Sequence, residues 1–173
     1  MSDTRVAFAH FIALAVHRID EAVARAKADP GLLHLRSGLD ETPLHYLVVE
    51  NQLNPVARLI RAGASVDVVN FCGSSPLLEA AMLGYVPMCK LLLEHGANPS
   101  VANNVDATPL SVAALRNHDE LFTLLLPFCS RDINEYFSEL DASELQRRTD
   151  HPIQRQCQHL GLRAGYENEE SAD

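Results

Sequence analysis

Apolar residues recur along the chain at helical spacing, in short groups that turn residues separate. The first group has the spacing of one buried helix face and consists of Phe8, Phe11, Ile12, Ala15 and Ile19. A second short helix is expected over residues 20–28, before the breaker Pro30-Gly31. The pattern therefore predicts a helical pair at the start of the chain.

Three apolar triplets follow, with the same internal spacing and a constant distance between copies. They are Val56/Leu59/Ile60, Cys89/Leu92/Leu93 and Phe122/Leu125/Leu126, and equivalent members lie 33 residues apart. Positions i, i+3 and i+4 share one side of a helix, so each triplet predicts a helix with a buried stripe. Gly63 and Gly96 can end the first two helices in a left-handed conformation, whereas Cys129 occupies that position in the third copy.

A Ser/Thr-Pro-Leu motif precedes each triplet. It begins at Thr42, Ser75 and Thr108, again at intervals of 33 residues. The hydroxyl can cap a helix, and proline suits the first helical position, where a missing N–H costs nothing. Each copy therefore predicts two helices, and the second is expected to begin near Asn54-Pro55, Val86-Pro87 and Asp119.

A helix pair followed by an extended loop, with this period and these residues, resembles the ankyrin repeat. The resemblance covers roughly residues 37–133 and rests on Thr42-Pro43-Leu44-His45, Ala80-Ala81, Gly84 and Ala113-Ala114. The copies also depart from the family pattern, because Leu47-Val48 replace the alanine pair and Leu78 and Ser111 replace the histidine. The resemblance implies an all-α repeat fold, an ankyrin solenoid of helix-turn-helix units with short extended β-turn loops. In it His45 is expected to bond within its own turn.

The terminal units of a solenoid expose faces that inner repeats bury, so we expect helical caps at both ends. Short helices are expected at residues 135–140, 143–148 and 152–160. The expected segments are an N-terminal helical cap or degenerate repeat (1–36), ankyrin repeats (37–69, 70–102 and 103–133), a C-terminal helical cap (134–164) and a disordered acidic tail (165–173).

Charge and composition narrow the class of partner. The formal net charge is −9 and no basic stripe is present, which argues against nucleic acid and anionic membranes as partners. The longest apolar run, residues 6–16, is shorter than the 20 or so residues that span a bilayer. The four cysteines form no closely spaced pair, which favours the reducing cytoplasm.

Reactive residues form no recognisable catalytic or metal-binding motif. His151, Cys157 and His159 form the tightest cluster of metal-ligand types, but they lack the paired spacing of a zinc site. Cys72 or Cys129 would form a catalytic pair with His118 only if folding brought them together. We therefore expect no enzyme activity, no cofactor and no metal.

The resemblance implies that a partner binds the concave side, made of the first helices and the loop tips. Carried over position by position, the expected contact residues are Tyr46, Val49, Glu50, Phe71, Cys72, Glu79, Met82, Leu83, Asn104, Val105, Val112, Leu115 and Arg116. Asn70 and Asn103 are expected at the loop tips, with Leu39 and Asp40 at the near end. Met82 and Phe71 are the expected anchors of an apolar patch. Alternatively, some of these side chains pack against neighbouring helices.

These features favour a protein-binding module that acts as an adaptor or an inhibitor and is a monomer or a weak homo-oligomer. Two alternatives stay open. The chain could be a structural protein that self-associates through its apolar face, or a bacterial immunity-type inhibitor of a cognate toxin.

Overall fold

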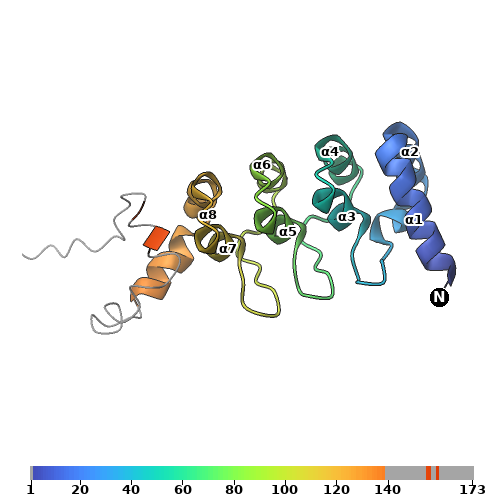
Figure 1. Ribbon diagram of the computed structural model, residues 1–173. Helices are drawn as coiled ribbons and strands as arrows, with labels where there is room; N and C mark the ends of the chain where they lie inside the picture. The colour runs from blue at the N-terminus through green and yellow to red at the C-terminus, as the bar shows by residue number, and fades with distance from the viewer. Residues whose placement is uncertain (1, 139–154, 157–158, 160–173) are drawn as a thin grey trace, which may run out of the picture. The chain divides into compact units, whose positions relative to one another are not determined.

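The computed structural model describes residues 2–138, 155–156 and 159 (Figure 1). Every regular element in these residues is helical, and none of them belongs to a strand. The all-α repeat fold is thereby confirmed. The chain divides into two compact units, residues 1–109 and 110–173, and each is described by itself.

The first unit contains three pairs of helices in two layers (Figure 1). Its elements are α1 (Ser2–His17), α2 (Ile19–Ala28), η1 (Pro30–His34), α3 (Pro43–Val49), α4 (Leu53–Arg61), α5 (Pro76–Met82) and α6 (Val86–Glu94). In one layer α3 contacts both α1 and α5, and in the other α4 contacts both α2 and α6. The N-terminal helices therefore stack on the first repeat.

The hydroxyl caps begin the first helices as predicted. The Thr42 Oγ1 atom accepts a hydrogen bond from the His45 main-chain N–H at 3.4 Å, and the Ser75 Oγ atom accepts one from the Leu78 N–H at 3.3 Å. The second helix of the first repeat begins at Leu53, so Pro55 lies within its first turn rather than at its start. Proline is tolerated there because the first N–H groups of a helix have no partner inside the helix.

Both layers of the first unit contribute to its core. Two members of each predicted stripe are fully inaccessible to water, Val56 and Leu59 of α4 and Cys89 and Leu92 of α6, whereas the third members, Ile60 and Leu93, are half-buried. Burial also raises the pKa of the Cys89 thiol to about 12, because an apolar environment disfavours the thiolate. Cys89 is therefore a packing residue and not a nucleophile.

The turn between the two helices of a repeat contains a residue in the left-handed backbone conformation, and this residue occupies the same position in each copy. Asn51 has φ 53° and Gly84 has φ 72°, and they are 33 residues apart. Asparagine tolerates this conformation better than most side chains. The sequence indicated this turn only in the second copy, where it is glycine.

The second unit contains α7 (Pro109–Leu115) and α8 (Asp119–Ser138). Residue Asp119 begins α8 as predicted, but the helix continues past Cys129 and through the expected boundary between residues 133 and 134. A separate helix beginning at residue 135 was therefore a wrong prediction, because no glycine ends α8 where Gly63 and Gly96 follow the earlier helices. Residues 143–148, most of 152–160 and the acidic tail lie outside the described residues.

Candidate functional site

Each of the three loops in the first unit is closed by its own hydrogen bonds. One polar side chain near the start of each loop accepts bonds from two main-chain N–H groups: Ser37 in the first, Asn70 in the second and Asn103 in the third. The Asn70 Oδ1 atom, for example, lies 2.9 Å from the Cys72 N atom and 3.1 Å from the Ser74 N atom. Asn70 and Asn103 shape their loops through these bonds, and their expected contact with a partner stays a prediction.

Neighbouring loops are also bonded to each other. The Phe71 N–H donates to the Leu39 carbonyl at 3.1 Å, and the Asn104 N–H donates to the Cys72 carbonyl at 3.0 Å. The Asn104 side chain adds a bond from Nδ2 to the Phe71 carbonyl at 3.2 Å. The three loops, which project on the same side of the first unit in Figure 1, therefore form a hydrogen-bonded ladder.

Apolar side chains occupy the tips of this ladder. Phe71 is 74% exposed and Val105 is 78% exposed, and Leu39 is also largely in water. Cys72 is an exposed free thiol in the same row. Exposed apolar groups on a backbone held by hydrogen bonds are typical of an interface. We call Leu39, Phe71, Cys72 and Val105 the tip row.

The exposed face of the first helices lies on α3 and α5. Tyr46 and Val49 of α3 are exposed, and so are Glu50 and Leu83, which directly follow α3 and α5. Glu79 and Met82 are half-buried, and the Glu79 Oε1 atom accepts a bond from Asn70 Nδ2 at 2.9 Å. Met82 therefore offers less surface than the loop tips do.

The α7 residues lie in the second unit. Leu115 and Arg116 are exposed, but Val112 is buried with 7% of its surface accessible, so its expected position in water is wrong. The equivalent residues in the earlier copies are Tyr46 and Glu79, whose longer side chains carry a polar end to solvent. A short aliphatic side chain has no such end, and it stays covered. Continuation of the binding face onto α7 remains a prediction.

His45 is a structural residue and does not belong to the candidate surface. Its imidazole is fully buried, with Nδ1 3.3 Å from the Thr42 N atom and Nε2 3.1 Å from the Ser74 carbonyl oxygen. Desolvation lowers the pKa of the imidazole, although the Ser74 carbonyl opposes this shift. The expected bond within its own turn is confirmed, and the side chain also reaches the next loop.

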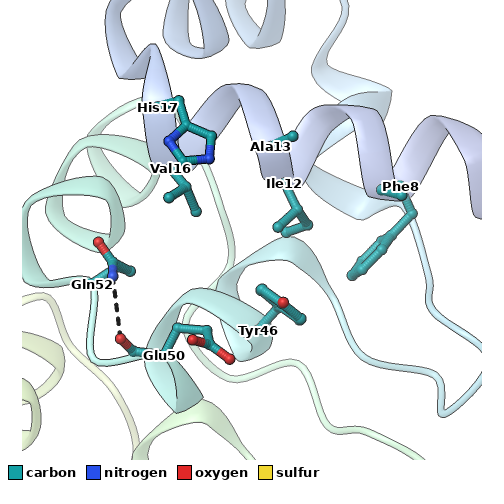
Figure 2. A pocket seen from close by; sticks show the side chains of 9 residues that line it. Phe8, Ile12, Ala13, Val16, His17, Tyr46, Glu50 and Gln52 are labelled. Carbon is teal, nitrogen blue, oxygen red and sulfur yellow. Dashed lines mark hydrogen bonds between the residues drawn. The ribbon is translucent and has the colours of Figure 1, made fainter.

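A groove between α1 and α3 was not foreseen from the sequence. It is lined by the side chains shown in Figure 2, which come from α1 and from α3 and the turn after it. The sequence predicts α1 as part of a helical cap or degenerate repeat and gives it no binding role. The available signal was the pair of small residues Ala9 and Ala13, one helical turn apart beside the buried stripe.

Chemistry-bearing groups are dispersed in the part of the chain that the structure describes. No three His, Cys, Asp or Glu side chains come close enough there to hold a metal ion. His159 of the suspected cluster lies 3.5 Å from an Asp119 carboxylate oxygen, whereas His151 and Cys157 lie outside the described residues. Of the helices described, none has the length and apolar character needed to cross a bilayer.

Known proteins resemble this chain over its repeats. A family model described as ankyrin repeats, in three copies, matches residues 14–103 and 44–136. NF-kappa-B inhibitor alpha of Gallus gallus is 32% identical over 75 residues, which are 43% of this chain and 24% of that protein.

Two further relatives match longer stretches. The B-cell lymphoma 3 protein homolog of Mus musculus is 36% identical over 89 residues, covering 51% of this chain and 19% of its own length. Protein PhlB of Serratia liquefaciens is 36% identical over 110 residues, covering 63% of this chain and 48% of its own. The chain thus spans less than half the length of each of these relatives.

Proposed function

The chain belongs to the ankyrin-repeat family, and on this premise we propose that it binds another protein through its tip row and the exposed face of α3 and α5. Ankyrin repeats imply protein–protein interaction. We further propose that the chain acts in the cytoplasm as an adaptor or an inhibitor, with no catalytic chemistry of its own.

The tip row is the single observation that carries this proposal. Leu39, Phe71 and Val105 present apolar surface to water from loops that hydrogen bonds tie to one another. Burying such side chains against a partner is favourable, by about 25 cal/mol for each Å² of apolar area. Because the loops are already ordered, little conformational entropy is lost on binding.

The choice between adaptor and inhibitor rests on likeness alone. One relative, NF-kappa-B inhibitor alpha, is named as an inhibitor. A rigid surface that covers part of a partner can act in either way, depending on whether the covered part is the partner's own functional site.

Affinity capture with matched variants tests this function. Phe71→Asp and Met82→Asp each place a charge on the proposed surface, and both should lose the partner that the wild-type chain retains from native cell extract. Leu53→Asp is the control, because Leu53 is an exposed apolar residue on α4, in the other helix layer. Circular dichroism should show the same helical content for all four proteins.

Two results would contradict the proposal. The first is a partner that both surface variants retain and the control loses. The second is the absence of any partner together with a mass that rises with concentration and falls in Phe71→Asp, which would favour the self-associating structural protein instead.

A further inference from the structure

The groove between α1 and α3 has a volume of about 470 Å³. This lies within the range of about 300–1,000 Å³ that is usual for ligand pockets. It is an open hollow beside the exposed face of α3, and Tyr46 and Glu50 belong both to that face and to the groove. A partner bound to the proposed surface could therefore extend directly into the groove.

Apolar side chains form the α1 wall of the groove. Phe8, Ile12 and Val16 follow one another at intervals of four residues, so they lie in a row along one face of the helix. Tyr46 stands opposite, with its ring edge-to-face with Phe8 at a centroid distance of 6.4 Å and an interplanar angle of 84° (Figure 2). Phe8 and Ile12 keep only 8% and 7% of their surface in water, so an apolar side chain of an occupant would mainly cover the half-buried Val16 and the exposed Tyr46 and release water from them.

Small residues keep the groove open. Ala9 and Ala13 line it and are exposed to water, one helical turn apart on α1. A longer side chain at either position would enter the space between the helices. Because both alanines are exposed, a substitution at either position can fill part of the hollow without changing a core residue.

The groove carries a negative charge with no cation beside it. Glu50 is the one carboxylate in the lining, which contains no lysine or arginine, and no salt bridge to Glu50 occurs among the described residues. Gln52 Nε2 donates to the Glu50 main-chain oxygen at 3.3 Å, so this hydrogen bond does not involve the Glu50 carboxylate. His17 of α1 and Tyr46 of α3 also line the groove.

The charge of the chain argues against its own C-terminal segment as the occupant. That segment carries Glu167, Glu169, Glu170 and Asp173, and the net charge of the whole chain is −9. Like charges would repel it from Glu50. A cationic group from another protein would be attracted instead.

We propose that this groove receives a bulky apolar side chain that a partner protein carries next to a lysine or arginine. The apolar side chain packs between Ile12 and Tyr46, and the basic group pairs with the Glu50 carboxylate. This inference rests on the proposed function and adds to it the chemistry that the partner presents at α1 and α3.

Selection from a phage-displayed library of random linear peptides tests the chemistry directly. Peptides enriched on the wild-type chain should share a Leu, Ile, Met or Phe next to a Lys or Arg. A synthetic copy of such a peptide should bind Ala13→Leu about tenfold or more weakly, because the added side chain fills the groove. Glu50→Gln should bind it about threefold more weakly at low salt, and the difference should shrink as salt is added.

Matched variants outside the groove provide the controls. Ala24→Leu makes the same change at an exposed position of α2, and Glu94→Gln neutralises an exposed carboxylate of α6. Both should bind the peptide as the wild type does. If Ala13→Leu unfolds, methyl NMR of the wild-type chain still decides, because the Ile12 and Val16 signals should shift when the peptide is added.

Several outcomes would overturn the inference. The first is a set of enriched peptides without a basic residue. The second is unchanged binding to Ala13→Leu together with no shift of the Ile12 methyl signals. The third is self-association that Ala13→Leu abolishes, because the occupant would then be a second copy of the chain. Peptide binding that Phe71→Asp and Met82→Asp abolish but Ala13→Leu does not would keep the proposed function and remove this groove from it.

Discussion

His45 joins two successive loops through its two ring nitrogens. Because the Thr42 N–H donates to Nδ1, this nitrogen accepts, and the proton of the neutral ring lies on Nε2, which donates to the Ser74 carbonyl. Protonation of Nδ1 would place its proton against the Thr42 N–H at a fully buried position. The fold therefore requires the neutral imidazole.

Folding stability should consequently fall in mild acid. The pKa of His45 is lowered in the folded chain from its ordinary value of 6.5, so the unfolded chain binds more protons below that pH. The stability from this residue is fully present above pH 6.5 and declines as the pH falls toward the lowered pKa. Urea unfolding of the wild type and His45→Leu at several pH values checks this, and the variant should lose part of the slope. Leucine is a fair replacement, since Leu78 holds the equivalent position in the next copy.

Position 73 requires glycine for two reasons, its left-handed backbone conformation and the closeness of the neighbouring loop. Its φ is 76°, and an added Cβ atom would lie 2.6 Å from Asn104 Oδ1 and 3.0 Å from the Asn104 main-chain nitrogen. At Gly96, by contrast, φ is 83° and nothing lies within 4 Å of an added Cβ atom. An alanine at position 96 would therefore have an unfavourable backbone conformation but would clash with no neighbouring atom.

Alanine substitution should separate these two effects. Gly96→Ala should lower the free energy of unfolding by about 1–2 kcal/mol, from the left-handed conformation alone. Gly73→Ala should cost clearly more, because the neighbouring loop must also move. Thermal or chemical denaturation of both variants measures the difference. Equal losses of the free energy of unfolding would show that the neighbouring loop moves aside without destabilising the fold.

Helix starts could be predicted from the sequence because their causes are local. Thr42 and Ser75 cap the residues that follow them, so each motif contains its own explanation. The end of α8 could not be predicted with the same security. Cys129 stands in place of the glycine that ends the earlier helices, and α8 continues through Pro127 and past Cys129, so its end depends on the rest of the unit.

The candidate site was predicted less completely, since it depends on the distances between elements. Tyr46, Glu50 and Phe71 lie exposed as expected, whereas Val112 is buried. The groove depends on how closely α1 approaches α3, and this spacing is set by packing rather than by any residue alone. Periodicity assigns residues to helix faces, but it does not show where two faces leave a gap.

Leu92 tests the helical register of α6. Its side chain is fully buried, so Leu92→Ala should lower the free energy of unfolding by about 2–5 kcal/mol through lost contacts and the cavity left behind. The neighbouring Lys90 is exposed, and Lys90→Ala should change the free energy by about 0.5 kcal/mol or less. Urea denaturation compares the two. Similar midpoints would contradict the assigned register.

In the first unit as a whole, the main contacts of each helix pair are with the pairs beside it. Repeat α3–α4 lies between two neighbours, because α3 contacts α1 and α5 while α4 contacts α2 and α6. The terminal helix α1 contacts α2 and α3. Stability in such an array is approximately a sum of terms within repeats and between neighbours.

Amide hydrogen exchange should therefore be graded along the first unit. The amides of α3 and α4 should be the better protected, and those of α1 should exchange faster because fewer neighbours hold it. Native-state exchange followed by mass spectrometry of peptides gives this order. Uniform protection from α1 to α4 would mean that the unit opens in one step.

Because each loop is closed by its own hydrogen bonds, such a chain can evolve by gaining or losing whole repeats. Ser37, Asn70 and Asn103 each close their own loop, and the bonds between loops recur at the same 33-residue interval. A duplication or deletion of 33 codons would therefore bring each loop beside a neighbour of the same geometry. The array can grow or shorten by whole units, and the tip row would lengthen or shorten with it.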